Sequence, residues 1–521
     1  MERSSRWTFV LCLFAGLVAL LVLVTSASSA HVRSVTVTNT NDSGPDSLRQ
    51  AIADAGPGAT IQFDLAYPAT ITLTSGQLRI SSKDVTIAGP GSDLLTISGN
   101  HAHRVFRVWA PPPHDIHVAI SGLTIHDGYT TGEFCNARAS GGGMVVEEGI
   151  LSLMLMDVAF RGNTTDCYGG GMAVDESNQL DEVVLTNVTF SGNSALRDGG
   201  GLFTEHSANL TNVAFHGNSA RNGGGLYATW ARMKLANVAF SGNSARVYGG
   251  GMRILSTSHI DIQNSILWGN RADASGDQIH NSRSDSYTTV AYSDIEGSGG
   301  SGKGWDSSLG FDGGHNLDAD PQFVGPADPA AAPTAVGDLH LLWGSPAIDS
   351  GKNSLFPPEV TTDLDGIPRI AFGTIDLGPY EFQEGLHLSK IASEVLVMPG
   401  QHVTYTIKVY NATGMMTDAL ISDTLPAELA LTGPVLLDPP EAGVVGTAPP
   451  ILVSDLTIEP RQVVTVMLPV TVQEGLAIGT IITNTVSFTS AQLMTPKVDS
   501  CTIGVPFPIY LPMAARQSRP R

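Results

Sequence analysis

The sequence predicts an all-β protein in which a right-handed parallel β-helix is followed by a small β-sandwich. Five glycine triplets recur along its middle, and their starts lie 28, 30, 24 and 26 residues apart. A second phrase, aromatic-x-Gly-Asn, recurs between the triplets, and after residue 385 short alternating strands are separated by regular turns. A period of roughly 20 to 50 residues is typical of solenoids and propellers, but a propeller blade needs about 40 residues for its four strands. The spacing therefore favours a β-helix.

The first 30 residues predict a signal peptide. Arg3 and Arg6 precede an apolar run over residues 7–24, and the small residues 28–30 resemble a cleavage site. We therefore expect a secreted or cell-surface protein. Membrane contact is expected only through this segment if it stays uncleaved, because the apolar run is long enough to span a bilayer.

The composition is acidic, with 49 Asp and Glu residues against 28 Lys and Arg residues and a formal net charge of −21. Nucleic-acid and anionic-lipid surfaces attract basic proteins. The charge balance therefore excludes nucleic acid as a partner and directs attention to extracellular glycans or proteins.

Three cysteines follow the predicted signal peptide, and two of them, Cys135 and Cys167, lie on neighbouring repeat units. Disulfides persist in exported proteins. A disulfide between coils and a pair of buried thiols both fit this spacing.

The predicted β-helix covers residues 31–317, including an N-terminal cap. Residues 35–125 lack the triplet and are expected to form irregular first coils, while a short helix over 47–55 would cover the open end of the stack. In later units the residues alternate as in strands, so stacking would align like residues in columns. Asn tolerates left-handed backbone angles, and its amide can bond to neighbouring coils. The predicted columns are Phe160, Phe190, Phe215 and Phe240; Asn187, Asn212 and Asn237; and Asn193, Asn218 and Asn243.

The rest of the chain divides into segments that differ in composition and in the pattern of apolar residues. Residues 297–317 are rich in Gly, Ser and Asp and predict a loop, and residues 318–385 predict the last coils and a closing cap. Alternating strands over 386–490 predict a β-sandwich, and 491–521 predict a Pro-rich tail with a basic end. Lys408 and Asn411 of the sandwich are residue types that form isopeptide bonds, but nothing else in the sequence supports a bond between them.

Three sets of phrases resemble known bacterial surface modules. The glycine-triplet and aromatic-x-x-Asn phrases resemble the repeats of the chlamydial polymorphic membrane proteins, which implies a pectate-lyase-like (pectin lyase-like) fold. The stretches Gly-Ser-Pro-Ala-Ile-Asp at 344–349, Asp-Leu-Asp-Gly at 363–366 and Asp-Leu-Gly-Pro-Tyr-Glu at 376–381 are similar to a closing module called choice-of-anchor Q. Val-Thr-Tyr-Thr-Ile-Lys-Val-Tyr-Asn at 403–411, followed by Asp-Thr-Leu-Pro at 423–426, resembles an immunoglobulin-like (Ig-like) repeat domain of bacterial cell-surface proteins.

The resemblance to the pectate-lyase-like fold makes a polysaccharide lyase or glycoside hydrolase the alternative function. A hydrolase needs two carboxyl groups roughly 5 to 9.5 Å apart, and a lyase needs calcium-binding carboxylates beside a basic residue. The residues before the five triplets form no carboxylate column; they are Ser140, Tyr168, Asp198, Asn222 and Tyr248. Asp175, Glu176, Asp181 and Glu182 fall within one coil and are interpreted as solvated loop acids.

Calcium is the one cofactor that the sequence leaves open; we expect no other. Asp363, Asp365 and Asp376 could supply oxygen ligands, but the spacing of an EF-hand is absent, and capping of turns is the alternative role. His101 and His103 share a strand face, which suits either a metal site or surface histidines.

The favoured function is that of an exported, non-catalytic protein that adheres to an extracellular glycan or protein through the long side of the β-helix. Exposed residues that differ from coil to coil would determine what is bound. These are Thr189, Arg197, Arg221, Trp230, Arg246 and Tyr248. A structural role in an envelope layer is a further alternative, which would show as self-assembly.

Overall fold

The computed structural model describes residues 34–505, except for 112–114, 133–134, 136–138, 176–181, 283–285, 372, 383–384, 412–414, 460–461 and 494. The predicted signal peptide and residues 506–521 of the predicted tail lie outside the described residues. The chain divides into two compact units, residues 1–382 and 383–521. No helix among the described residues has the length and apolarity that crossing a membrane requires.

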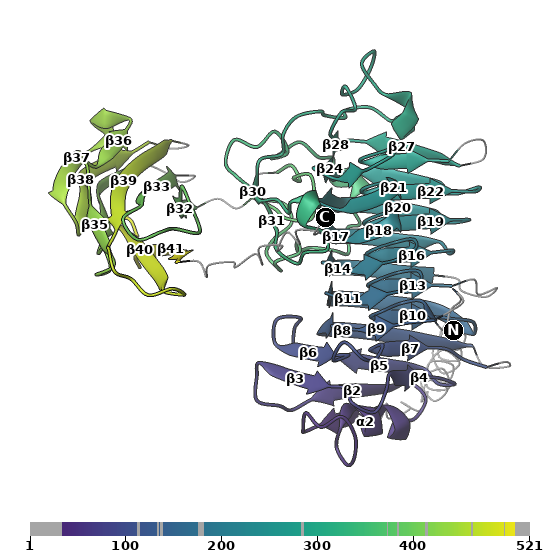
Figure 1. Cartoon of the computed structure of the whole chain (residues 1–521). Coiled ribbons are helices and arrows are strands. Elements are labelled where there is room, and N and C mark those ends of the chain that lie inside the picture. The colour runs from purple at the N-terminus through teal and green to yellow at the C-terminus, as the bar shows by residue number, and fades with distance from the viewer. Residues whose placement is uncertain are drawn as a thin grey trace, which may run out of the picture. The chain divides into compact units, whose positions relative to one another are not determined.

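The first unit is a parallel β-solenoid, whose coils are stacked along one axis (Figure 1). Three sheets form its walls. The first sheet contains β1 (Ser34–Val37), β2 (Ala59–Phe63), β3 (Ala69–Thr72), β5 (Val85–Ala88), β6 (Leu95–Ser98), β8 (Ile116–His126), β11 (Ile150–Arg161), β14 (Glu182–Ser191), β17 (Ala208–His216), β20 (Arg232–Ser241), β23 (His259–Gln263), β24 (Ile266–Trp268), β27 (Tyr287–Ala291), β28 (Asp294–Ile295) and β29 (Phe311–Asp312). The second contains β4 (Leu78–Ile80), β7 (Phe106–Val108), β10 (Met144–Val146), β13 (Met172–Val174), β16 (Leu202–Thr204), β19 (Leu226–Thr229), β22 (Met252–Leu255) and β26 (Ile279–Asn281). The third contains β9 (Tyr129–Thr130), β12 (Thr164–Thr165), β15 (Ser194–Ala195), β18 (Ser219–Asn222), β21 (Ser244–Tyr248) and β25 (Arg271–Ala272).

The phenylalanines of the repeat stack inside the solenoid. Phe160 is in register with Phe190, Phe190 with Phe215, and Phe215 with Phe240. Their successive ring centroids lie 4.8, 4.8 and 4.5 Å apart, and the ring planes are tilted by only 7°, 4° and 1°. Because this spacing is that of neighbouring strands, each coil places its ring directly on the previous one, and Leu267 follows Phe240 in the same register.

A short helix, α2 (Leu48–Asp54), lies at the N-terminal end of the solenoid (Figure 1). The Ser47 hydroxyl accepts a hydrogen bond from the backbone N–H of Gln50, which is the usual role of an N-cap serine. Leu48, Ala51 and Ile52 are buried against the core. The helix therefore covers the apolar end of the first coil.

The Gly/Ser-rich segment 297–317 covers the other end of the core. The 3-10 turn η2 (Ser307–Leu309) places Leu309 in the solenoid core, and Trp305 packs against the same core. The Trp305 indole Nε1 donates to the carbonyl of Gly310 at 2.8 Å. A segment whose composition predicts only a loop thus contributes its few large apolar side chains as a cap.

Residues 318–382, which we call the flanking segment, do not form the last coils and closing cap that the sequence predicts. They lie along the side of the solenoid instead. β30 (Phe323–Gly325) and β31 (Asp338–Leu341) pair in antiparallel fashion, and two 3-10 turns, η3 (Pro329–Ala331) and η4 (Asn353–Leu355), interrupt the rest. The segment packs on the outer face of the first sheet, beside β17 (Figure 1). The side chains of this contact are Ala214, Ala239 and Ile266 of the sheet and Phe323, Leu339, Leu341, Ala347 and Leu377 of the flanking segment. The outward-facing alanines and Ile266 form an apolar strip on the sheet. Because burial of this strip is favourable, the flanking segment packs on the side of the solenoid and not on its end.

The second unit consists of two antiparallel five-stranded sheets that share one core. One sheet contains β32 (Leu386–Ala392), β33 (His402–Asn411), β39 (Val463–Val472), β35 (Leu429–Leu431) and β36 (Leu436–Asp438); the other contains β37 (Val444–Ala448), β38 (Ile451–Ile458), β34 (Met416–Asp423), β40 (Ile481–Thr489) and β41 (Lys497–Gly504), and η5 (Pro440–Ala442) precedes β37. The boundary predicted at residue 490 is too early, because β41 pairs with β40 along its length and Ile503 enters the core.

Candidate functional site

The asparagines after each aromatic residue form a buried ladder through the solenoid. Asn218 is typical: its Nδ2 donates to the Asn243 Oδ1 at 2.9 Å and to the Phe190 carbonyl at 2.8 Å. Its Oδ1 accepts from the backbone N–H and the Nδ2 of Asn193. Because every polar atom of the amide is paired, this column is part of the scaffold.

The other asparagine column serves the flanking segment. Asn187, Asn212 and Asn237 have left-handed backbones, with φ of 54°, 51° and 56°. The Nδ2 of Asn212 donates to the Thr362 carbonyl at 2.7 Å, and that of Asn237 donates to the Asp376 carbonyl at 2.8 Å. This column therefore shapes the strand bend and holds the flanking segment to the sheet.

A continuous row of rings and one guanidinium lies on the outer face of the second sheet and in the adjoining ends of the third-sheet segments; we call it the aromatic face. It comprises Tyr168, Phe203, Tyr227, Tyr248, Arg253 and His280. Phe203, Tyr227, Arg253 and His280 occupy one register position on successive strands. The ring centroids of Tyr168 and Phe203 lie 4.8 Å apart, and those of Phe203 and Tyr227 lie 5.4 Å apart. The Arg253 guanidinium continues the row, 5.9 Å from the Tyr227 centroid and 4.7 Å from that of Tyr248, whose ring lies 4.5 Å from His280.

The aromatic face also carries polar atoms that the described residues leave unsatisfied. The Arg253 Nε, the Asn222 Oδ1 and the His280 Nδ1 are buried and have no hydrogen-bond partner there. Burial raises the pKa of the Asp198 carboxyl, although the hydrogen bond from Asn222 Nδ2 at 2.6 Å acts in the opposite direction. Buried polar atoms are normally paired, so these three atoms are exceptions within the fold.

Three arginines border this face in an acidic protein. Arg221 and Arg246 are exposed on β18 and β21 of the third sheet, and Arg197 is exposed just after β15. Arg197 and Arg221 are close enough to Asp198 to lower the pKa of its carboxyl, against the larger effect of burial. Of the other residues predicted for binding, Thr189 faces outward from the first sheet, and Trp230 is exposed in the turn between β19 and β20.

Cys135 and Cys167 form a disulfide that closes a loop between neighbouring repeat units. The Cys167 side chain is fully buried. Cys501, in the second unit, is a free thiol.

The three calcium candidates are engaged in turns or ion pairs. Asp363 accepts backbone N–H bonds from Asp365, Ile367 and Glu381 at 3.0, 3.1 and 2.9 Å. Asp376 accepts such bonds from Asp349 and Phe382, and the Asp365 Oδ2 lies 2.6 Å from the His340 Nε2. Within the described ranges, no group of three or more His, Cys, Asp and Glu side chains could hold a metal ion.

The remaining candidates from the sequence do not converge. His101 is largely exposed and lies 3.3 Å from Asp127. Of the four acids in one coil, Asp175 follows β13, Glu182 begins β14, and Glu176 and Asp181 lie outside the described residues.

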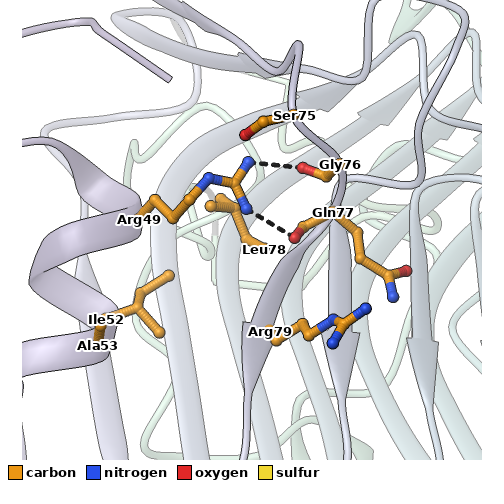
Figure 2. Close-up of a pocket in the computed structure, with 8 residues that line it drawn as sticks. All are labelled: Arg49, Ile52, Ala53, Ser75, Gly76, Gln77, Leu78 and Arg79. Atoms are coloured by element: carbon orange, nitrogen blue, oxygen red, sulfur yellow. Dashed lines mark hydrogen bonds between the residues drawn. The ribbon is translucent and has the colours of Figure 1, made fainter. Parts of the chain in front are cut away.

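A pocket of about 360 Å³ opens beside α2 (Figure 2). Figure 2 shows Arg49 reaching from the helix toward Gly76 and Gln77, to whose carbonyls its guanidinium donates at 2.5 and 2.8 Å. The same guanidinium pairs with Asp42 at 2.6 Å. The residues of the pocket therefore anchor the N-terminal cap, and the Arg49 guanidinium is already paired within the protein.

The repeat matches a known family model. The Chlamydia polymorphic membrane protein repeat matches residues 187–205, which include Phe203 of the aromatic face and Asp198 beside it. The match covers less than one coil, so it identifies the repeat and indicates a surface-associated protein, without establishing membership of the whole chain. A comparison with curated proteins finds no match.

Two solved structures of bacterial surface proteins show distant similarity to this chain. The major pilin subunit BcpA of Bacillus cereus is 18% identical over 28% of this chain and 46% of the pilin, with a TM-score of 0.20. ACE19, the collagen-binding subdomain of the Enterococcus faecalis surface protein ACE, is 12% identical over 22% of this chain and 95% of that one, with a TM-score of 0.16. The chain thus spans less than half the length of the pilin, and TM-scores this low establish neither fold nor function.

Sequence reasoning found Tyr248 but missed most of the aromatic face. Phe203, Tyr227 and Arg253 each stand two positions after the last glycine of a triplet. The alternation of a strand places that residue outward when the apolar residue before it points inward. Large residues at this outward position were the available signal.

Proposed function

We propose that the protein is an exported, surface-associated adhesin that binds another extracellular protein through the aromatic face, without catalysis. The continuous row from Tyr168 to His280, bordered by three exposed arginines, is the observation that carries this proposal. The same proposal includes a right-handed coil for the solenoid. It also includes an Ig-like fold for the second unit, which would serve as a spacer or attachment module.

A protein partner suits this face better than a glycan. Phe203 and Tyr227 are stacked with an interplanar angle of 17°, so each covers the flat side of its neighbour. A sugar ring packs on an open aromatic face, whereas this row presents ring edges, tyrosine hydroxyls and an arginine. Tyr and Arg are enriched among the residues that dominate protein–protein binding energy, and the bordering arginines favour an acidic partner surface.

Binding of the purified protein to a panel of extracellular proteins and to a glycan array would test this function. We expect saturable binding to a protein target, and Tyr227→Ala should weaken it by about 30-fold, the effect of removing a hot-spot residue of about 2 kcal/mol. Tyr287→Ala is the matched control, because Tyr287 is an exposed tyrosine of the first sheet whose ring contacts that of His259, away from the aromatic face.

Other outcomes of the same measurements would replace the proposal. Equal losses in both variants would exclude the aromatic face as the binding site. Binding to glycans alone would assign the protein to glycan recognition. Release of unsaturated or reducing sugar ends would indicate the lyase or hydrolase alternative, and ordered self-assembly would indicate an envelope-layer role.

A further inference from the structure

The core of the second unit contains a lysine and an asparagine that both contact the same aspartate. Lys390 lies on β32, Asp423 at the end of β34 and Asn484 on β40, and their residues are 4%, 1% and 0% exposed. The Lys390 ammonium donates to the Asp423 Oδ2, and the Asn484 Nδ2 donates to the same oxygen at 3.4 Å. β32 belongs to one sheet and β34 and β40 to the other, so the contact crosses the core.

This cluster is not a fully paired structural network. The Asp423 Oδ1, the Asn484 Oδ1 and the hydroxyl of Tyr405 are buried without a hydrogen-bond partner among the described residues. The Lys390 Nζ lies 4.7 Å from the centre of the Tyr405 ring. Leaving buried polar atoms unpaired is costly, and an arrangement that keeps three of them needs a reason other than stability.

The surroundings favour the uncharged forms of both ionisable groups. Burial lowers the pKa of Lys390 and raises the pKa of Asp423, and the attraction between the two opposes both changes. An uncharged amine has the free electron pair that nucleophilic attack requires, and a protonated carboxyl can donate a proton.

We propose that Lys390 and Asn484 become joined by an intramolecular isopeptide bond, with Asp423 transferring the protons. In this step the Lys390 Nζ attacks the Asn484 Cγ, the new Nζ–Cγ bond forms and the Cγ–Nδ2 bond breaks. Asp423 accepts a proton from the attacking nitrogen and delivers a proton to Nδ2, which leaves as ammonia. One amide replaces another, so no oxidant, reductant or further reactant is needed.

The geometry assigns the roles within the cluster. The Asp423 Oδ2 touches both the nitrogen that must lose a proton and the nitrogen that must gain one, so Asp423 is the proton carrier and Asn484 the electrophile. Lys408 and Asn411 do not fit: Lys408 is exposed, and the Asn411 Nδ2 donates to the carbonyl of Ile458.

The bond would connect the first strand of the unit to its penultimate strand. β32 is an edge strand of its sheet. Without a covalent link it is held by β33, by packing across the core and by a hydrogen bond from the Lys390 backbone N–H to the Asp499 carboxylate of β41. A link to β40 would keep β32 from peeling away when tension acts on the chain. It would also close a long loop, and the constraint from such a link grows with loop length.

Mass spectrometry of the purified full chain tests this proposal. After disulfide reduction, we expect the protein to be lighter than its mature sequence by one ammonia. A tryptic digest should contain the peptide of Lys390 joined to the peptide of Asn484, because trypsin does not cleave at a lysine whose amine is acylated. The wild-type spectrum alone decides the outcome, whether or not any variant folds.

Variants assign the roles. Lys390→Met and Asp423→Asn should each restore the full sequence mass and separate peptides, and Lys408→Arg, a change at an exposed lysine of the next strand, should keep the link. A wild-type mass without the deficit, with separate peptides, would overturn the proposal. A loss of water with Lys390 joined to Asp423 would overturn the assignment of Asn484 as the electrophile.

Discussion

The two units bury polar side chains in opposite ways. In the solenoid, one asparagine per coil enters the interior, and its amide pairs with the coils on both sides, as at Asn193 and Asn218. In the second unit, Lys390, Asp423 and Asn484 form a single cluster without a repeat, and the Oδ1 atoms of Asp423 and Asn484 have no hydrogen-bond partner among the described residues. A buried polar group that repeats and is satisfied supports a fold, whereas one that is unique and unsatisfied is a place to look for chemistry.

The difference follows from the topology of each unit. A coil of the solenoid contacts only the coils before and after it, so a side chain that satisfies both neighbours can be repeated along the axis. The strands of the second unit pair over long sequence separations, as when β33 pairs with β39. Its core has no axis along which one solution could recur.

The largest expected effect comes from removing one buried ring in each unit. Phe215→Ala and Phe488→Ala each delete a fully buried phenyl group and should lower the free energy of unfolding by about 3 to 5 kcal/mol. Hydrogen exchange should show the damage confined to coils around Phe215, because stability along a solenoid is a sum of local terms, but spread over the whole second unit for Phe488. Phe311→Ala, at a ring 65% exposed, is the control and should change stability by less than about 0.5 kcal/mol. Loss of protection along the entire solenoid would contradict the comparison.

The buried ladder should be almost as sensitive. Asn218→Ala leaves the Phe190 carbonyl, the Asn193 amide groups and the Asn243 Oδ1 each short of a bond, and we expect a loss of about 3 kcal/mol, measured by denaturant unfolding. Asn209→Ala, at an exposed asparagine of β17 in the same coil, should be nearly neutral. Similar effects for the two variants would mean that the ladder does not hold the coils together.

The periodic parts of the molecule were predictable from the sequence, and the single-copy parts were not. The columns of Phe and Asn could be read because each coil repeats the same local environment. The position of the flanking segment could not, because it depends on a strip of small residues, such as Ala214 and Ala239, that becomes one surface only after the coils stack. The same holds for the aromatic face, whose residues Phe203, Tyr227 and Arg253 stand 24 and 26 residues apart in sequence.

The lysine cluster had a signal that sequence reasoning did not use. Lys390 stands in phase with Leu386 and Leu388, and Asn484 stands in phase with Ile482 and Val486. Strand alternation places both on the inward face, where a lysine is rare unless it is paired. That the two meet across the core follows from the pairing of distant strands, which the local pattern does not contain.

Protonation of His216 should destabilise the flanking segment in acid, by a smaller amount. His216 is buried beneath this segment, where a Cβ added at Gly337 would lie 2.8 Å from its Nδ1, and burial lowers the pKa of the imidazole to about 4. The unfolded chain takes up this proton near pH 6.5, so the stability contributed by neutral His216 falls as the pH drops from about 6.5 toward 4, by about 2 kcal/mol at pH 5.

Hydrogen exchange of residues 323–341 at pH 7 and pH 5 checks this expectation. His216→Gln should abolish its part of the pH dependence, which separates it from Glu381, whose pKa burial raises to about 8 and whose contribution therefore falls as the pH rises from about 4.5 to 8. An identical pH response in both proteins would exclude His216 as the cause.

The smallest effect separates the two asparagine columns within the solenoid. Asn187 has a φ of 54°, and its Oδ1 accepts one bond from Asn212, whose Nδ2 also bonds to the Thr362 carbonyl. Its main role is thus to occupy a left-handed backbone, where a residue with a plain Cβ costs about 1 kcal/mol. Asn187→Ala should lower the free energy of unfolding by about that amount, and Asn187→Gly by only a few tenths of a kcal/mol, since glycine adopts this backbone freely. Asn218 is not among the residues with positive φ, so Asn218→Gly should be at least as harmful as Asn218→Ala. Equal losses for Gly and Ala at position 187 would show that both columns act through hydrogen bonds, and the repeat would then contain one kind of asparagine where the backbone indicates two.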